Sequence, residues 1–286
     1  MTILDAFREK AAGIVSKVGI GLGDSATHNI KILKAILGIL KLNNSSFFFF
    51  GKKYQLDQIA KNPMYEKLKS SLVLINSEDP TSEIIHYLND KLISCAVRGS
   101  LNSSNFLKNL AVILKISEIN RLALLETKFG HQFFFGPVGI DECNNFNSKK
   151  RFIEKALNQM SNLNIEPRIS VLSGGRLGDI GRNAEIDKTI KEAKDLVNFF
   201  KQENPDLEIE HSEILIENAI RKKSNLILAP NGISGNLIYR TLVHLGGGKA
   251  YGAIYMGIGY NIIDTSRVGN FSEIYGGIIL ALALLN

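Results

Sequence analysis

A short polar run near the end of the chain, residues 264–267 (Asp-Thr-Ser-Arg), combines a carboxylate, two hydroxyls and a guanidinium. It follows an apolar segment, 253–258, and precedes a helical pattern that begins near Asn270. An arginine fork matches the oxygens of phosphate or carboxylate, and a helix N-terminus offers unpaired N–H groups to an anion. The run therefore predicts a site for an anion or another polar ligand.

A second polar turn follows the apolar run 225–229. Pro230 ends the strand pattern, residues 231–234 form a turn, and a helical pattern resumes at Gly235. Strand, polar turn and helix thus follow one another here, as they do again at 253–270. Both turns are expected to leave the same end of a parallel sheet, where open α/β sheets place their ligands.

Two further loops combine cations with small residues. Residues 98–104 read Arg-Gly-Ser-Leu-Asn-Ser-Ser, so a guanidinium at a strand end precedes hydroxyls at a helix start. Both groups supply donors to a phosphate, although Ser103 or Ser104 could equally be an N-cap. The loop 173–182 contains glycines and two arginines, which allow close backbone approach and a bidentate grip on an anion. A surface loop with solvated arginines is the alternative.

These motifs resemble the C-terminal signature of the phosphotransacetylase and phosphotransbutyrylase superfamily, whose members pass an acyl group between coenzyme A and phosphate. The family pattern is a strand ending in Pro, a turn with Gly-Asn, a helix ending in Leu-Gly-Gly, a second strand and Asp-x-Ser-Arg. Here it reads Pro230, Gly235-Asn236, 245–247 and 264–267. Within this superfamily, the compact length and altered loops look most similar to the archaeal methanogenesis-marker MtxX family, which carries the name of a methyltransferase subunit.

The resemblance implies a phosphate acyltransferase that binds phosphate and an acyl-CoA-type substrate in an interdomain cleft. It implies that Arg98 and Arg267 hold phosphate, that Ser266 hydrogen-bonds the leaving thiolate or the oxyanion, and that Glu273 acts as a base. No tightly bound cofactor is expected, since coenzyme A and phosphate would be substrates. The substrate-binding residues expected from the four loops are Ser100, Asn102, Ser103, Ser173, Gly174, Gly175, Arg176, Arg182, Asn231, Ser234, Gly235, Asn236 and Asp264.

Three positions depart from the family pattern. Asn231 stands where the family has Asp, Ile263 where it has Asn, and Val268 where it has Gly. These changes alter hydrogen bonding and shape beside Ser266, so the fold and the binding site could be kept while the reaction differs. The alternative is an MtxX-type protein that works with a methyltransferase partner. The chain lacks a glycine-rich methyl-donor signature followed by an acidic strand end, which argues against stand-alone S-adenosylmethionine chemistry.

Composition limits the remaining classes. A chain of 286 residues with 45% hydrophobic and 22% charged residues is typical of a soluble globular protein. The formal net charge of +6 suits phosphate-bearing small molecules, and no basic run interleaved with aromatic residues supports nucleic-acid binding. The most apolar segment, 274–285, is well short of the ~20 residues of a membrane span, so no membrane contact is expected.

Other site types find little support in the sequence. Neither the histidines nor the two cysteines show metal-ligand spacing, so no metal site is expected, and unpaired cysteines indicate the reducing cytoplasm. Gly21, Gly23 and Ala26 match G-x-G-x-x-A. An NAD site would want an acidic residue after the next strand, yet the strand 47–50 is followed by Gly-Lys-Lys. A tight strand-to-helix turn is the simpler interpretation.

Short apolar runs alternate with helical periods, which predicts an α/β fold with mostly parallel, doubly wound sheets. The polar segment 136–148, marked by Gly and Pro, is the predicted interdomain crossing. The resemblance implies a two-domain architecture of the isocitrate/isopropylmalate-dehydrogenase type, in which the last strand and helix return to the first domain, and it implies a homodimer. We therefore expect one domain from 1–135 plus 252–286 and another from 136–251.

Overall fold

The computed structural model describes residues 1–285 and contains two compact units. Unit 1 comprises residues 1–119 and the segment from Ala250 onward, and unit 2 comprises residues 120–249. The strands at 120–126 and 132–136, which we expected at the end of the first domain, lie in unit 2 because the second of them pairs with a strand at 226–228. That the two units are separate domains stays a prediction.

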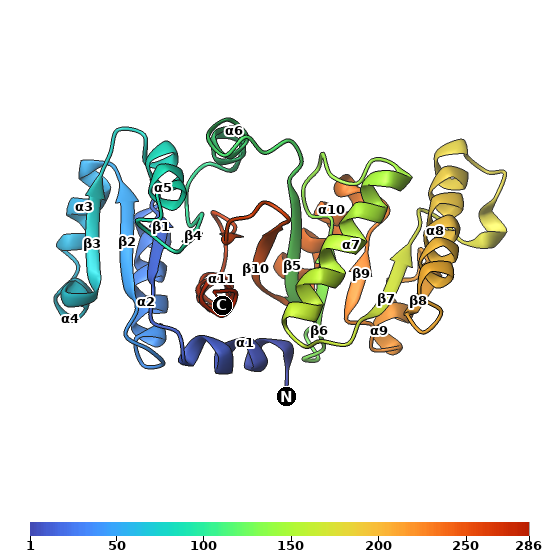
Figure 1. Ribbon diagram of the computed structural model, residues 1–286, viewed down its shortest axis with the longest axis horizontal. Coiled ribbons are helices and arrows are strands. Elements are labelled where there is room, and N and C mark those ends of the chain that lie inside the picture. Colours follow the sequence, from blue (N-terminus) through green and yellow to red (C-terminus); the bar gives the residue numbers. More distant parts are fainter. Residues whose placement is uncertain (286) are drawn as a thin grey trace. The chain divides into compact units, whose positions relative to one another are not determined.

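Unit 1 is an α/β unit with strand order β3-β2-β1-β4-β11-β10 (Figure 1). Each pair of neighbouring strands from β3 to β11 is parallel, and β10 is antiparallel to β11. Its elements are α1 (Ile3–Ala12), β1 (Lys17–Gly21), α2 (Ala26–Ile39), β2 (Ser46–Gly51), α3 (Lys53–Ala60), α4 (Pro63–Leu68), β3 (Leu72–Asn76), α5 (Pro80–Asn89), β4 (Cys95–Val97), α6 (Ser103–Ile113), β10 (Lys249–Met256), β11 (Ile262–Asp264) and α11 (Phe271–Ala283).

Helices cover both faces of the sheet in unit 1. Ala96 of β4 and Ile262 of β11 belong to a core cluster with residues of α5 and α6, among them Ile84 and Phe106. The next residues along these strands, Val97 and Ile263, turn to the other face, where a Cβ on Gly277 of α11 would meet both of them. Because side chains alternate across a strand, α6 and α11 lie on opposite faces. The expected α/β class and the double winding of this sheet are thus confirmed.

One expected strand–loop connection is wrong in detail. The apolar segment 253–258 was expected to be the parallel strand that leads into the Asp-Thr-Ser-Arg loop. Instead β10 ends at Met256 and turns back through Gly257 and Gly259, whose φ angles are +70° and +72°. Glycine adopts such angles at no steric cost, because it has no Cβ. The short strand β11 follows, pairs parallel to β4, and itself delivers the polar loop.

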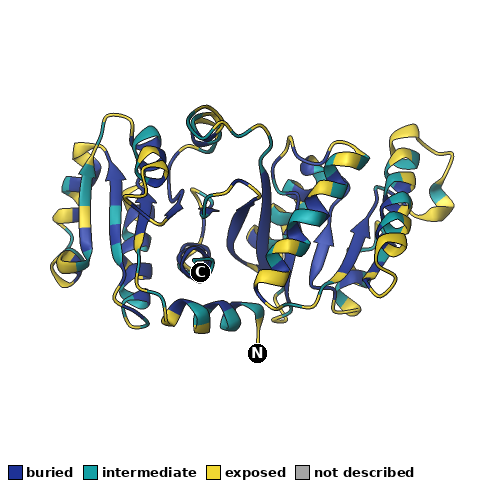
Figure 2. Cartoon of the chain, in the orientation of Figure 1, coloured by how far each residue is buried: buried dark blue, intermediate teal, exposed yellow. Residues whose placement is uncertain are grey.

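Unit 2 is a second α/β unit with strand order β5-β6-β9-β7-β8. β5 and β6 are antiparallel, and the other neighbours are parallel. Most strand residues are buried, whereas the helices have exposed outer faces (Figure 2). Its elements are β5 (Asn120–Glu126), β6 (Gln132–Gly136), α7 (Phe146–Asn162), β7 (Arg168–Leu172), α8 (Ala184–Glu203), β8 (Glu208–Glu213), α9 (Ile216–Arg221), β9 (Leu226–Leu228) and α10 (Gly232–His244).

The first turn of α10 packs directly on the backbone that follows β6. A Cβ on Gly232 would lie 1.7 Å from the carbonyl oxygen of Gly139, and one on Gly235 would lie 1.9 Å from that of Pro137. The side-chain amide of Asn236 donates to the Val138 carbonyl at 2.8 Å. The Gly-Asn motif therefore holds a helix against a neighbouring loop, and its expected contact with a ligand stays a prediction.

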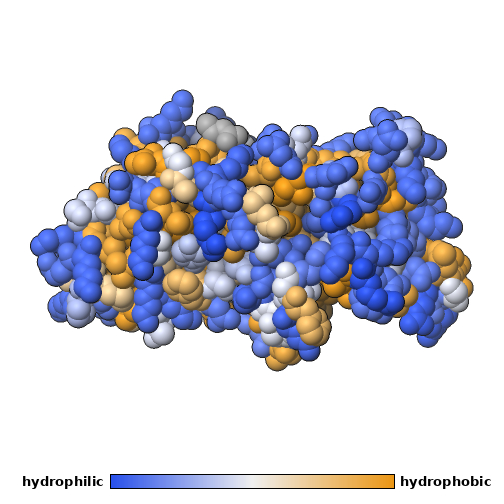
Figure 3. All heavy atoms as spheres, turned by 90° about the horizontal axis from the view of Figure 1, so that it is seen from below, coloured by the Kyte–Doolittle hydropathy of each residue, from blue (hydrophilic) through white to orange (hydrophobic). Residues whose placement is uncertain are grey.

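Within residues 1–285, no helix is both long and apolar enough to cross a membrane. Hydrophilic residues are spread over the face shown in Figure 3, with apolar residues interspersed among them.

Replacing Gly235 by Ala tests the close approach of α10 to residues 136–139. Helix propensity alone predicts a gain of about 1 kcal/mol for this change. We expect a loss of about 2 kcal/mol in the free energy of unfolding by urea, because the new Cβ would meet backbone that cannot move aside.

Gly178→Ala is the matched control, because a Cβ at this position would meet no atom within 4 Å. It should keep the stability or raise it by up to about 1 kcal/mol, because alanine restricts the unfolded chain. A Gly235→Ala protein as stable as this control would contradict the packing described here.

Candidate active site

The candidate site in unit 1 lies where β4 and β11 end side by side. The two strands are parallel neighbours, with Ala96 opposite Ile262 and Val97 opposite Ile263. The residues that follow, Arg98 and the loop from Asp264, therefore emerge at one edge of the sheet. This is the carboxyl edge, where open α/β sheets carry their ligand-binding loops.

The guanidinium of Arg98 joins the two loops. Its Nε donates to a carboxylate oxygen of Asp264, and its two terminal nitrogens donate to the carbonyls of Leu101 and Thr265. Arg98 is only 4% exposed. Its buried guanidinium is held by the charge of Asp264 and by hydrogen bonds on several sides. Arg98 and Asp264 were expected to bind substrate, whereas the structure shows them bound to each other. The pair ties the two loops together, and a contact of either side chain with substrate stays a prediction.

The loop after β4 is locked against the loop after β1. Gly99 has a φ of +62°, and a Cβ there would lie 2.1 Å from the Gly21 carbonyl. Ser100 accepts from the Gly23 N–H at 2.6 Å and donates to the Asn29 amide oxygen at 2.8 Å. Ser100 is thus a buried hydroxyl with a structural role, and its contact with substrate stays a prediction. The glycines of the G-x-G-x-x-A match allow this packing, as expected of a tight turn.

Residues 102 and 103 begin α6. The Asn102 side chain accepts from the Asn105 N–H at 3.1 Å, so Asn102 is the N-cap. The sequence also allows Ser103 or Ser104 in this role, but Ser103 is the first helical residue. The Asn102 side-chain oxygen is therefore engaged within the protein.

The loop after β11 carries the groups best placed to meet an anion. The Ser266 N–H donates to Glu273 Oε1 at 2.8 Å, and the Ser266 hydroxyl accepts from the Val268 N–H at 3.3 Å. The hydroxyl proton of Ser266 is not used in these two bonds. Arg267 is exposed and makes no hydrogen bond or ion pair within residues 1–285. Asn270 is the N-cap of α11, and its side chain accepts no hydrogen bond from the first N–H groups of this helix, which face back toward the loop that precedes it.

Glu273 is buried behind this loop. It is 4% exposed, and a Cβ on Gly269 would lie 2.5 Å from Glu273 Oε2, which shows how closely the loop wraps the carboxylate. Ile263, where the related enzymes have Asn, is fully buried toward α11. Val268, where they have Gly, is 63% exposed. Ile263 therefore changes the packing beneath the site, and Val268 changes the exposed surface at its edge.

In unit 2, the loop 173–182 satisfies its own polar groups. The buried Ser173 hydroxyl donates to the Gly175 carbonyl at 2.8 Å and lies 2.8 Å from His211 Nε2. The Gly174 N–H donates to Thr189 Oγ1 at 2.8 Å. The Arg176 N–H donates to the Asp179 carboxylate, and this carboxylate also holds the exposed Arg182 at 2.6 Å. The carboxylates of Asp179 and Glu213 accept hydrogen bonds from this loop, so they make it less favourable to an anion than its arginines alone would predict.

Asn231 and Ser234 form a capping box at the start of α10. The Asn231 side chain accepts from the Ser234 N–H at 2.9 Å, and the Ser234 hydroxyl accepts from the Asn231 N–H at 3.2 Å. Such a box satisfies the free N–H groups of a helix start. These two residues therefore have a structural role that our ligand-loop interpretation did not foresee.

Arg98, Asp264, Ser266, Arg267 and Glu273 are thus brought together in unit 1, and the expected residues of unit 2 form clusters of their own. That the loops of the two units share one cleft stays a prediction.

His28 was missed by the sequence reasoning. It lies in the first turn of α2, is 2% exposed, and neither ring nitrogen has a hydrogen-bond partner in the described part of the chain. Burial, and secondarily the charges of Lys31 and Arg98, lower the pKa of His28 from 6.5 to about 4. The imidazole is therefore neutral near pH 7 and sits beside the Arg98 network.

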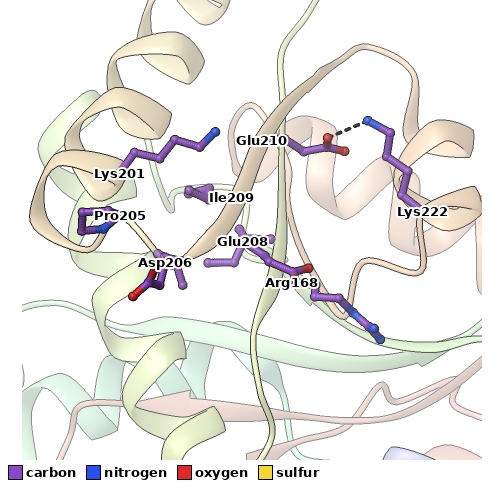
Figure 4. A pocket seen from close by; sticks show the side chains of 10 residues that line it. Arg168, Lys201, Pro205, Asp206, Glu208, Ile209, Glu210 and Lys222 are labelled. Carbon is purple, nitrogen blue, oxygen red and sulfur yellow. Dashed lines mark hydrogen bonds and ion pairs between the residues drawn. The ribbon is translucent and has the colours of Figure 1, made fainter.

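A hollow of about 450 Å³ lies at the opposite end of the strands in unit 2, where β7 and β8 begin (Figure 4). Its walls include the Pro-Asp-Leu-Glu-Ile segment 205–209. Lys222 and Glu210 face each other across one side at 2.6 Å. Because acidic and basic side chains alternate around this hollow, it shows no preference for an anion. The described residues contain no cluster of His, Cys, Asp or Glu that could hold a metal ion.

Known structures define the class of the fold. A branched-chain phosphotransacylase from Enterococcus faecalis superposes with a TM-score of 0.70 and 16% identity, covering 95% of this chain and 100% of that chain. A phosphotransacetylase from Streptococcus pyogenes superposes with a TM-score of 0.72 and 16% identity, covering 98% and 97%. The chain therefore has the phosphotransacylase fold.

Sequence relatives define the family. No family model matches the chain. A protein of Methanosarcina mazei named "Putative methyltransferase mtx subunit X" is 36% identical over 283 residues, which is 99% of this chain and 95% of the relative. The chain belongs to this MtxX family, as its motifs predicted.

The buried imidazole predicts a pH dependence of stability. With a pKa of about 4 in the folded protein and 6.5 when exposed, His28 takes up a proton in the unfolded chain first as the pH falls. Stability is therefore full above pH 6.5, falls between 6.5 and 4, and levels off below. The difference corresponds to about 3 kcal/mol.

His28→Gln removes this titration, and urea unfolding of both proteins across this pH range measures it. The wild-type protein should lose about 3 kcal/mol more than the variant between pH 6.5 and 4. Parallel pH profiles would contradict a buried neutral His28.

Proposed function

We propose that this protein binds phosphate and an acyl-CoA-type substrate and transfers the acyl group between coenzyme A and phosphate. The observation that supports the proposal is the loop after β11. Here Arg267 makes no hydrogen bond or ion pair within residues 1–285, and the Ser266 hydroxyl proton is not used in the bonds described above. Both residues precede the N-terminus of α11, which has no side-chain cap. A guanidinium fork and helix N–H groups together favour a phosphate ligand.

The neighbouring groups fit acyl transfer. A phosphate oxygen would attack the thioester carbon, the carbon–sulfur bond would break, and the products would be an acyl phosphate and the thiolate of coenzyme A. The Ser266 hydroxyl can donate its proton in a hydrogen bond to the oxyanion or to the departing sulfur. Glu273 holds the Ser266 backbone at 2.8 Å and so fixes this hydroxyl. The resemblance implies that Glu273 acts as a base toward phosphate. Because phosphate is already partly dianionic near neutral pH, its positioning can also supply much of the rate enhancement.

The comparisons support a transferase. The fold is that of phosphotransacylases, and the relatives carry the name of a methyltransferase subunit. The proposal includes coenzyme A and phosphate as substrates. It also includes a cleft shared by both units, a homodimer and a cytoplasmic location.

A second candidate is an accessory subunit of a methyltransferase complex. The names of the relatives favour it, as do the departures at Ile263 and Val268 and the helix-capping role of Asn231. In this case the site would bind a phosphorylated or CoA-like ligand without acyl transfer, and the methyltransferase partner would supply the chemistry.

The enzyme assay uses the purified protein with coenzyme A and acetyl or butyryl phosphate, and it follows thioester formation by absorbance. We expect turnover by the wild-type protein and a loss of about 10²- to 10³-fold in kcat/KM for Arg267→Ala, the size expected for one lost donor to the reacting anion. Arg240→Ala, at an exposed position of α10, is the control and should keep full activity.

Absence of thioester across a panel of acyl phosphates would refute acyl transfer. If coenzyme A still raised the melting temperature of the same protein, the accessory role would be favoured, because a ligand that binds only the folded state stabilises it.

A further inference from the structure

The side chain of Lys31, on α2, reaches the loop that carries Ser266 and Arg267. Its Nζ donates to the Gly269 carbonyl at 3.1 Å, and the Gly269 N–H donates in turn to the Ser266 carbonyl at 2.9 Å. The ammonium therefore lies against the turn that contains Arg267. Because 238 positions separate Lys31 from Gly269, only the fold brings them together.

The packing of α2 on α11 holds Lys31 in this place. A Cβ on Gly38, two turns beyond Lys31, would lie 3.0 Å from the Tyr275 ring of α11. Residues seven apart lie on one face of a helix, so Lys31 and Gly38 both face α11 and the loop before it. The absence of a side chain at Gly38 lets the two helices approach each other closely.

The charge of Lys31 is not paired within the protein. In residues 1–285, Lys31 makes no ion pair, and its ammonium donates only to a neutral backbone carbonyl. An ammonium has three N–H donors, so two remain for another acceptor. The side chain is half-buried, and therefore its charge is less screened by water than that of a fully exposed lysine.

Two more positive groups lie at the same loop. Arg267 is exposed and makes no ion pair within residues 1–285, and the N-terminus of α11 is the positive end of a helix dipole. The buried Glu273 offsets part of this charge from beneath the loop. Like charges held close together repel each other, so the arrangement becomes favourable when an anion binds among them.

We infer that Lys31 is a second cationic ligand of the phosphate subsite, where its ammonium donates to an oxygen of the anion that Arg267 holds. The inference rests on the proposed function, since it assigns a further residue to the same site. Two side chains then supply two positive charges, so the subsite favours a doubly charged phosphate group over a singly charged one.

The test is titration calorimetry of the purified protein with sodium phosphate at pH 7.5. Lys31→Met removes the charge at similar chain length and should weaken phosphate binding by about tenfold, because one charged hydrogen bond is lost. Lys31→Arg keeps the charge and should retain most of the affinity. Lys34→Met is the matched control, because Lys34 is an exposed lysine of the same helix, and it should bind phosphate as the wild type does.

Lys31→Gln distinguishes a ligand contact from mere support of the loop. Its amide can still donate to the Gly269 carbonyl but carries no charge, so it should lose about as much phosphate affinity as Lys31→Met. Methyl phosphate and dimethyl phosphate give a second readout, because the first carries up to two negative charges and the second only one. Lys31→Met should weaken the binding of methyl phosphate more than that of dimethyl phosphate.

A measurement on the wild-type protein covers the case in which the uncharged variants fail to fold. In a sample labelled with ¹³C-lysine, phosphate should shift the Cε signal of Lys31, which Lys31→Arg identifies by its absence. The Cε signal of Lys34 should stay in place.

The outcomes separate this inference from the proposed function. Equal phosphate affinity of the wild type and Lys31→Met, full affinity in Lys31→Gln, or an unshifted Lys31 signal at saturating phosphate would overturn the role of Lys31 and leave the Arg267 site standing. A wild-type protein that does not bind phosphate would overturn both.

Discussion

The buried guanidinium of Arg98 is the constraint on which the candidate site depends. A cation removed from water must be surrounded by acceptors, and here they come from Asp264, Leu101 and Thr265. These acceptors belong to loops far apart in sequence, so satisfying one side chain fixes two strand ends at once. The Thr265 hydroxyl adds a bond to the Gly99 carbonyl at 3.1 Å. The next residue along the chain is Ser266, whose position is set by this network and by Glu273.

The sequence predicted the α/β class and most helices and strands, because their apolar periods are long and regular. It also located the loops after β4 and β11 as ligand-edge loops. It failed to assign β11, since a three-residue strand has too few residues to show a period, and the longer run that forms β10 concealed it. The resemblance placed the loops of Arg98 and Asp264 at one site, but without β11 the sequence did not indicate that these two side chains pair with each other.

The functional roles of polar residues were harder to predict than their positions. Asn231 and Ser234 have the spacing of a capping box, and the same spacing is found in loops that bind anions, so local sequence cannot distinguish the two. The carboxylates around residues 173–182 come partly from α8 and β8, which only the fold brings to that loop. For His28 a signal existed: it precedes Ile32 and Ile36 at helical spacing, which places it on the buried face of α2. Its unpaired nitrogens became evident only from the three-dimensional packing.

The central claim is that Asp264 serves the site by holding Arg98 and the two loops. The most direct test is the phosphate affinity of Asp264→Asn, measured by titration calorimetry beside the wild type. Loss of a negative charge near an anion site should by itself tighten phosphate binding. The account predicts the opposite, an affinity about tenfold weaker. The Asn oxygen can still accept from Arg98, but the bond loses the charge that strengthens it, so the two loops are held less firmly. Unchanged or tighter phosphate binding by Asp264→Asn would contradict it.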